Sequence, residues 1–128
     1  VLLTGGTGFL GKNVARALSA RGHEVRLLAR EGSNLAGLPA GDIARGDVCD
    51  AASVRRAAEG CQAVLHMAAL VKMWVPERSV FDRVNVDGLR AALAAAEAVG
   101  ARLVYTSSFM AIGPTGAQPA DEHLEGAR

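Results

Sequence analysis

The feature that most constrains the fold is a short apolar run that leads into spaced glycines at the start of the chain. It reads Val1-Leu2-Leu3-Thr4-Gly5-Gly6-Thr7-Gly8-Phe9-Leu10-Gly11. Gly5, Gly8 and Gly11 suit, in that order, a tight turn, a backbone brought close to a pyrophosphate, and close packing of the next helix on the strand. The first amides of that helix lack intrahelical partners and carry the positive end of its dipole, which favours an anion. We therefore predict a phosphate-binding turn.

Glycine spacing alone is weak evidence, because many glycine-rich turns satisfy it. The residues after the turn strengthen the prediction, since Leu10, Val14, Ala17 and Leu18 recur at helical spacing. A strand before the glycines and an amphipathic helix after them form the setting that a dinucleotide-binding turn requires. The alternative is a strand-to-helix turn that binds nothing.

Composition and charge narrow the class of partner. The chain has 128 residues, of which 14 are basic and 13 acidic, and a net charge of +1. This balance predicts no nucleic-acid surface, and the length suits one domain or a part of one. No apolar stretch approaches the roughly 20 residues that cross a bilayer. We expect a soluble, cytoplasmic protein with a small-molecule partner and no membrane contact.

The cysteines and the chain ends give two further expectations. Cys49 and Cys61 could in principle form a disulfide, but no signal-like segment is present, so we expect reduced thiols that act as small buried side chains. The chain starts at Val1 rather than at a methionine, and it stops at Arg128 after a loop rich in glycine, proline and acidic residues. Both ends look cut.

Strands and helices are predicted to alternate along the chain. Gly22, Gly60 and Gly100 suit the left-handed positions that end helices, Asp50 suits an N-cap, and Pro76 suits the first turn of a long helix. We expect helices over 9–21, 51–59 and 76–100, strands over the first apolar run, 25–29, 43–46, 63–67 and 102–106, and a loop over 31–41. This order implies right-handed parallel crossovers and a doubly wound, Rossmann-type α/β sheet.

In such a sheet ligands lie beyond the carboxyl ends of the strands. The end of the second strand distinguishes the two nicotinamide cofactors, because an acid there bonds a free ribose whereas a guanidinium binds a 2′-phosphate. Here Arg30 occupies that place, and Ser33 and Asn34 could add hydrogen bonds. NADP(H) is therefore favoured. In the alternative, Arg30 is a solvated charge and Glu31 takes the ribose of NAD(H).

Several residues of the second half of the chain could act at the site or only stabilise the fold. Asn85 lies on the apolar stripe of the long helix, so its amide must be satisfied. We expect it to bond the main chain of a neighbouring strand and also to hold a water or backbone group beside the active site. Ser108 and its neighbours could hydrogen-bond a substrate carbonyl or only cap a turn. His66 suits a buried, hydrogen-bonded histidine, and nothing near it has metal-site spacing, so we predict no metal. Trp74 is either an exposed loop aromatic or part of a substrate wall.

Taken together, these stretches resemble the extended short-chain dehydrogenase/reductases. Residues 4–11 are similar to the family's Thr-Gly-x-x-Gly-Phe-x-Gly, residues 46–48 to its Gly-Asp-hydrophobic turn, 66–69 to His-x-Ala-Ala, 85–88 to Asn-Val-x-Gly, and 105–108 to the segment that holds its serine. Arg30 and residues 73–76 are most similar to the dihydroflavonol-reductase-like branch and related bacterial enzymes often named as sugar epimerases. The resemblance covers the chain from Leu2 to about Glu122.

The resemblance implies hydride transfer at a carbonyl or secondary alcohol, with catalytic roles for Ser108 and Asn85. It assigns the 2′-phosphate to Arg30 and the adenine to Asp47 and Val48. The nicotinamide side is assigned to residues 68–69 and 106–107. The full set implied to contact the cofactor is Gly5, Thr7, Gly8, Phe9, Leu10, Gly11, Arg30, Asp47, Val48, Met67, Ala68, Ala69, Thr106 and Ser107.

The sequence departs from the family at the proton donor. The family's Tyr-x-x-x-Lys follows the serine, whereas Tyr105 precedes it and the lysines are Lys12 and Lys72. We therefore expect residues 1–128 to be a truncated dinucleotide-binding domain that lacks the later strands and the substrate-binding part. Alone it should bind cofactor without turning it over, because general acid/base catalysis contributes about 10²–10⁴-fold.

Three functions remain open at this stage. The favoured one is the cofactor-binding part of an NADP(H)-dependent reductase of small carbonyl compounds. The second is an NAD-dependent nucleotide-sugar epimerase or dehydratase, and the third is a sensor or scaffold module that binds dinucleotide and never turns it over. The alanine-rich face at 91–98 could pack against a partner in a homodimer, or against a neighbour within the chain.

Overall fold

The computed structural model describes residues 1–113 and residue 121 of the chain. Five parallel strands form one sheet in the order β3-β2-β1-β4-β5, with β1 at Leu2–Thr4, β2 at Arg26–Ala29, β3 at Asp42–Arg45, β4 at Ala63–His66 and β5 at Arg102–Tyr105. The helices are α1 (Phe9–Ala20), α2 (Ala51–Ala58), α3 (Ser79–Phe81), the π-helical η1 (Asp82–Asp87), α4 (Gly88–Ala98) and the 3-10 helix η2 (Phe109–Ile112). The predicted doubly wound α/β fold is confirmed.

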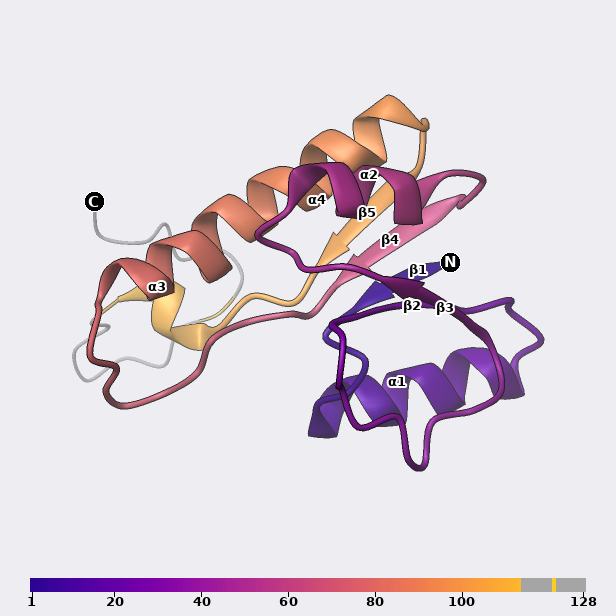
Figure 1. The fold of residues 1–128 in the computed structure, drawn as a ribbon, viewed down its shortest axis with the longest axis horizontal. Coiled ribbons are helices and arrows are strands. Elements are labelled where there is room, and N and C mark those ends of the chain that lie inside the picture. Colours follow the sequence, from indigo (N-terminus) through magenta and orange to yellow (C-terminus); the bar gives the residue numbers. More distant parts are fainter. Residues whose placement is uncertain (114–120, 122–128) are drawn as a thin grey trace.

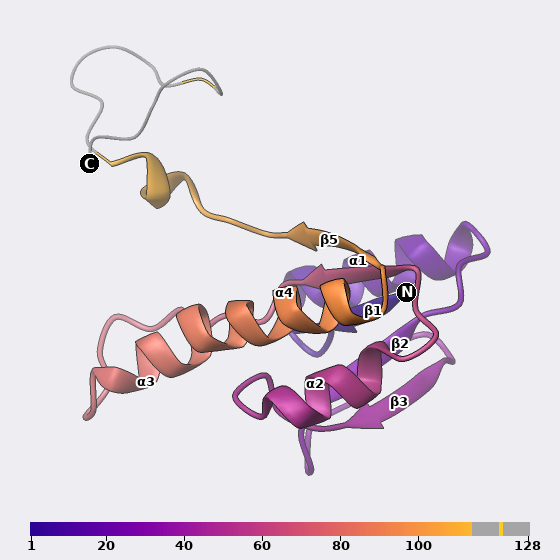
Figure 2. The ribbon, with the colours of Figure 1, turned by 90° about the horizontal axis from the view of Figure 1, so that it is seen from above.

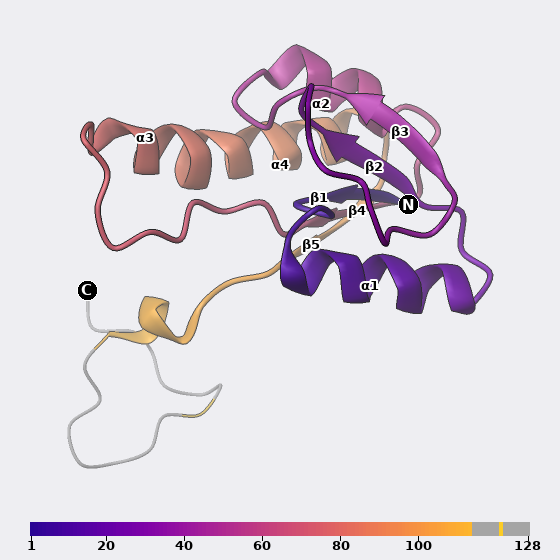
Figure 3. The same cartoon turned by 60° about the horizontal axis from the view of Figure 1, so that its bottom comes forward.

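The sheet lies between two helical layers. Helix α1 covers one face, while α2 and α4 cover the other (Figures 1 and 3). Neighbouring residues of β1 point to opposite faces, so Leu2 packs with Val54 and Ala92 under α2 and α4, whereas Leu3 packs with Ala15 under α1. Helices α2 and α4 lie side by side (Figure 2). The strand order places the carboxyl ends of β1, β2 and β4 at one edge.

Helix α1 agrees with the prediction in length but not in its buried face. It ends at Ala20 and is followed by Gly22, whose φ is +79°. Gly11 and Ala15 are its buried residues, whereas Leu10 and Ala17, predicted to belong to the apolar stripe, are exposed. The reason is the contact of Gly11 with the glycine turn, which rotates its own side of the helix toward the sheet.

The prediction of one long helix from Pro76 was wrong at its start. Pro76 precedes the helical residues, which begin at Ser79, because Glu77 closes the preceding bend: its carbonyl accepts from the Val80 amide and its carboxylate accepts from the Ser79 hydroxyl. Proline fits a first helical turn but does not require one. The helical stretch also contains the π-helical η1, a form that is frequent at functional sites.

Most other local predictions are confirmed. The Asp50 carboxylate accepts from the Ala52 amide at the start of α2, and Gly60 and Gly100 have positive φ. Cys61 is buried and free as expected, but Cys49, predicted to be buried, is exposed, because it lies in the turn before α2. No helix among the described residues is long and apolar enough to span a membrane. The predicted loop before Arg128 lies outside the described residues.

Candidate functional site

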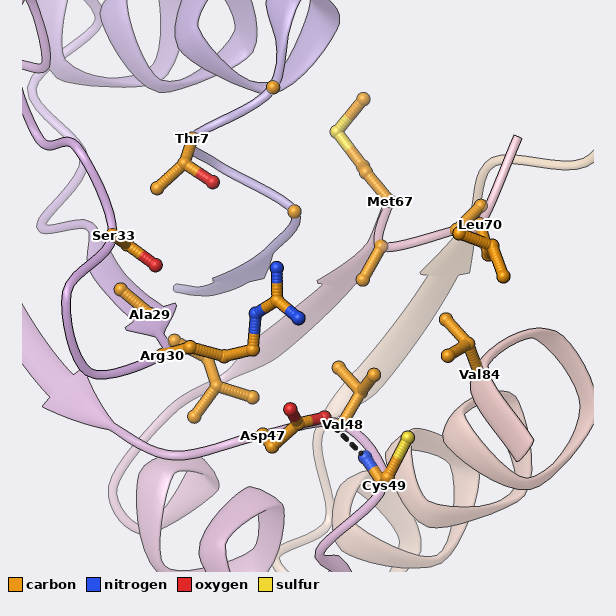
Figure 4. A pocket seen from close by; sticks show the side chains of 15 residues that line it. Thr7, Ala29, Arg30, Ser33, Asp47, Val48, Cys49, Met67, Leu70 and Val84 are labelled. Atoms are coloured by element: carbon orange, nitrogen blue, oxygen red, sulfur yellow. Dashed lines mark hydrogen bonds between the residues drawn. The ribbon is translucent and has the colours of Figure 1, made fainter. Parts of the chain in front are cut away.

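A cavity of about 310 Å³ opens at the carboxyl ends of β1, β2 and β4 (Figure 4). Five segments build it: the glycine turn, the end of β2 with the loop after it, the turn between β3 and α2, the segment after β4, and η1. Its lining residues are Gly5, Thr7, Gly8, Leu28, Ala29, Arg30, Ser33, Asp47, Val48, Cys49, Met67, Ala68, Ala69, Leu70 and Val84.

The glycine turn is crowded by backbone. A Cβ added at Gly5, where φ is +71°, would lie 2.6 Å from the Ala68 nitrogen, and one at Gly11 would lie 2.2 Å from the Gly5 carbonyl oxygen. The Gly8 amide donates to that same oxygen at 3.1 Å. Helix α1 starts with no side-chain cap and no acid in its first turn. Its amino end therefore suits an anion.

The segment after β4 is fixed to the end of β1 by one hydroxyl group. Thr4 Oγ1 accepts from the amides of Met67 and Ala68, each at 3.2 Å, and lies 3.0 Å from Nδ1 of His66. Two accepted bonds leave the hydroxyl hydrogen for Nδ1, so His66 is neutral with its hydrogen on Nε2. Burial of the ring lowers the pKa of His66, in agreement with its neutral form. Nε2 has no hydrogen-bond partner among the described residues.

The end of β2 presents the guanidinium of Arg30, which reaches into the cavity (Figure 4). No hydrogen bond or ion pair engages this guanidinium within the described part of the chain. The hydroxyl of Ser33 lines the same end of the cavity. Glu31 does not line it, and its carboxylate lies 3.9 Å from Arg45 Nε.

The turn between β3 and α2 is held by hydrogen bonds that leave part of a carboxylate free. Ser53 Oγ accepts from the Asp47 amide at 3.1 Å and donates to the Asp47 carbonyl at 2.9 Å. Asp47 Oδ1 accepts from the Cys49 amide at 2.9 Å. Burial, and then the charge of Asp47, raise the pKa of Cys49, so its thiol stays protonated. The second oxygen of Asp47 can accept from a ligand.

Asn85 holds a backbone group beside the cavity, as one part of the sequence prediction expected, but this group lies after β4 and not on a strand. Its Oδ1 accepts from the Leu70 amide at 2.8 Å, and its Nδ2 donates to the Leu70 carbonyl at 3.2 Å. This pair of bonds ties η1 to the segment after β4, and both Leu70 and Val84 line the cavity. Asn85 itself does not line it, so its role here is to position the wall.

The cavity brings together nine of the residues predicted to contact the cofactor: Gly5, Thr7, Gly8, Arg30, Asp47, Val48, Met67, Ala68 and Ala69. The others predicted for the site do not line it: Phe9, Leu10, Gly11, Asn85, Thr106, Ser107 and Ser108. Phe9 is 89% exposed, and Gly11 serves the packing of α1. Ser108 Oγ accepts from the Met110 amide at 3.2 Å, the turn-capping interpretation of that serine.

Sequence reasoning missed several lining residues, among them Leu28, Cys49, Leu70 and Val84. Cys49 follows the predicted Asp47-Val48 turn directly, so the turn could have indicated it. Leu70 and Val84 meet only through the Asn85 bonds, which no spacing in the sequence reveals. No group of three or more metal-ligating side chains occurs among the described residues.

Comparisons with known proteins agree with this geometry. The model of the NAD dependent epimerase/dehydratase family matches residues 1–127. A protein of Synechocystis sp. that carries the name of a dihydroflavonol 4-reductase is 44% identical over 96% of this chain. The chain spans 37% of the length of that relative.

Two solved structures share the fold. A short-chain dehydrogenase/reductase superfamily protein from Agrobacterium tumefaciens with bound NAD is 30% identical, with a TM-score of 0.82 over 98% of this chain and 38% of its own. UDP-glucose 4-epimerase from Thermus thermophilus, in complex with NAD, is 29% identical, with a TM-score of 0.82 over 98% of this chain and 43% of its own. The family resemblance predicted from the motifs is confirmed.

Proposed function

Since the chain belongs to the NAD dependent epimerase/dehydratase family, we propose that it is the cofactor-binding part of an NADP(H)-dependent oxidoreductase. The bound nicotinamide would supply or accept a hydride at a carbonyl compound or the corresponding secondary alcohol. The residues of the cavity fit such a cofactor, because the glycine turn approaches the ligand with backbone alone and the amino end of α1 favours its pyrophosphate.

The observation that carries the NADP(H) preference is the guanidinium of Arg30, which has no hydrogen-bond or ion-pair partner among the described residues. It lines the cavity at the end of β2, where the 2′ position of the adenosine ribose lies in this type of fold. A 2′-phosphate would give it a charged, bidentate partner. Asp47 is the only acidic residue that lines the described cavity, and it lies after β3 rather than after β2.

The remaining roles follow from the positions of the lining segments. The hydroxyl of Ser33 would donate to the same phosphate, and Asp47 would accept from the adenosine. The segment from Met67 to Ala69 would support the nicotinamide side of the cofactor. Ser108 accepts from Met110 through its oxygen and so keeps its hydroxyl hydrogen available to orient a substrate oxygen. Thr106 and Ser107 stay proposed contacts.

Catalysis in the complete protein needs a proton donor beside Ser108. Tyr105 does not match the family's proton donor, because it precedes Ser108 and has Phe109, not a lysine, four positions after it. We expect a Tyr-x-x-x-Lys sequence to follow Arg128 in the gene. Its absence there would favour the third function, a binding module without turnover.

Titration of the protein with NADPH and NADH tests the proposal. We expect tighter binding of NADPH, and an Arg30→Ala variant should lose about ten- to hundredfold in affinity for NADPH while its affinity for NADH changes little. Arg21→Ala is the matched control, because Arg21 is a cation at the end of α1 that does not line the cavity and whose guanidinium donates to the Ala17 carbonyl. Equal affinity losses for both cofactors in the Arg30 variant would contradict the proposal.

An NAD-dependent epimerase or dehydratase of nucleotide sugars is the second candidate. The likeness to the NAD-bound UDP-glucose 4-epimerase favours it. It requires that Arg30 tolerate a free ribose, so a clear preference of the unmodified protein for NADH would select this candidate over the reductase.

A further inference from the structure

The loop after β2, residues 30–41, forms the ribose end of the cavity but contains no helix or strand. Its residues Arg30 and Ser33 line the cavity. Short bonds shape the loop from within: the Ser33 amide donates to the Arg30 carbonyl at 3.1 Å, and the Ala36 amide donates to Asn34 Oδ1 at 2.9 Å. These local bonds set turns, but they do not fix the distance of the loop from the glycine turn.

Two cations of α1 donate hydrogen bonds to the main chain of the loop, in addition to the packing of Leu38 against the core cluster that contains Ala15. Lys12 Nζ donates to the Ala36 carbonyl at 2.9 Å. Arg16 donates to the Gly37 carbonyl through both Nε, at 3.1 Å, and Nη2, at 2.7 Å. Lys12 and Arg16 are four residues apart and therefore share one face of the helix. The fit is close, since a Cβ at Gly37 would lie 3.0 Å from Arg16 Nη2.

Helix α1 thus joins the two places where phosphate groups are expected. Its amino end starts at the glycine turn, and its first two turns carry the cations that grip the loop. Lys12, Arg16 and Arg30 have no carboxylate partner within the described residues. Their charges are directed to carbonyls or to the cavity, so this end of the site favours an additional anion.

We infer that Lys12 and Arg16 are positioning residues that hold residues 33–37 at the ribose end of the cavity and thereby set the preference for a 2′-phosphorylated cofactor. This inference rests on the proposed NADP(H) preference. Arg30 and Ser33 would contact the phosphate, while Lys12 and Arg16 act through the carbonyls of Ala36 and Gly37. NAD(H) lacks the 2′-phosphate, so its binding should depend much less on the loop.

The experiment compares Arg16→Met and Lys12→Met with Arg21→Met, and measures the dissociation constants of NADPH and NADH. Arg21→Met removes one positive charge from the end of the same helix without touching the loop. We expect the Arg16 and Lys12 variants to lose about tenfold in affinity for NADPH, with NADH affinity little changed. Arg16→Lys should recover part of the loss, because lysine keeps the charge but offers no planar fork of donors.

Hydrogen exchange of the cofactor-free protein gives a readout that does not depend on cofactor choice. Amides of residues 33–38 should exchange faster in Arg16→Met than in the unmodified protein or in Arg21→Met. Unchanged exchange together with an unchanged NADPH-to-NADH ratio would overturn the inference, and so would an equal effect of Arg21→Met, which would indicate bulk charge. A preference of the unmodified protein for NADH would refute the proposed cofactor instead, and faster exchange would still support the positioning role.

Discussion

Replacement of Gly5 by alanine tests whether the glycine turn and the segment after β4 are in direct backbone contact. A Cβ at Gly5 would lie 2.6 Å from the Met67 carbonyl carbon and 2.6 Å from the Ala68 nitrogen. Backbone atoms cannot rotate away as a side chain would, so the segment after β4 must shift. Gly22 is a matched control, because its φ is +79° against +71° at Gly5, and a Cβ there would meet no atom within 4 Å.

Both variants place alanine in the left-handed region, which costs about 1–2 kcal/mol for a residue with a side chain. The reduced entropy of the unfolded chain returns about 0.4–1 kcal/mol in each case. Gly22→Ala should therefore lower the free energy of unfolding by about 1 kcal/mol. Gly5→Ala adds the cost of overpacking, about 1–3 kcal/mol, so the expected difference between the variants is of that size.

Urea denaturation followed by circular dichroism measures both free energies of unfolding. The slope m should stay the same in the two variants, because the surface exposed on unfolding does not change. Cofactor titration adds a second measurement, in which only Gly5→Ala should weaken binding. Equal losses of stability in Gly5→Ala and Gly22→Ala would refute the reasoning, since conformation alone would then account for both.

Three further predictions concern the polar contacts around the cavity. Burial lowers the pKa of His66 below its ordinary value of 6.5, so the unfolded chain binds the proton first. The free energy of unfolding should therefore fall as the pH drops below 6.5, by up to about 1.4 kcal/mol per pH unit, and His66→Asn should reduce this slope in urea titrations at several pH values. Thr4→Val should lower the free energy of unfolding by about 1–3 kcal/mol and weaken the binding of both cofactors alike, because two amides lose their acceptor. Thr4→Ser should retain most of the stability and most of the affinity. Equal behaviour of the two variants would contradict this role of the hydroxyl. Asn85→Ala should lower the free energy of unfolding by about 1–3 kcal/mol, because the amide and carbonyl of Leu70 lose their partners. Val86 is exposed in the same π-helical turn, so Val86→Ala should lower it clearly less in the same urea titrations.

Much of the fold could be predicted from local patterns. The glycine turn, the positive-φ residues Gly22, Gly60 and Gly100, and the Asp50 cap each depend on neighbours in the sequence, and all are confirmed. The start of the long helix could not be predicted, because Pro76 is compatible with a helix that begins three residues later, after the bend at Glu77. The helix propensity of one residue says little about where a helix begins when a nearby side chain can stabilise a different starting point.

The residues of the candidate site likewise include some that local sequence patterns predict and some that they do not. Arg30 and Asp47 were predictable because each follows a strand whose end must face the ligand in a parallel sheet. Leu70 and Val84 were not, because their meeting depends on Asn85, whose two bonds join residues 15 positions apart. The sequence places strand ends reliably, but walls that come from the packing of a loop on a helix need the structure.

The difference between backbone and side-chain surfaces determines which part of the function can be inferred from this chain. Under the proposed function, the pyrophosphate lies against the backbone of Gly5 and Gly8, and such a surface accepts any dinucleotide. Under the proposed function, discrimination between cofactors falls to the side chains that point into the cavity, chiefly the guanidinium of Arg30, which has no charged or hydrogen-bonding partner among the described residues. Under the same proposal the loop after Arg30 must be held in place, and Lys12 and Arg16 are the described side chains of α1 that donate hydrogen bonds to it. Under the proposed NADP(H) preference, cofactor choice is therefore a property of α1 as much as of the strand end.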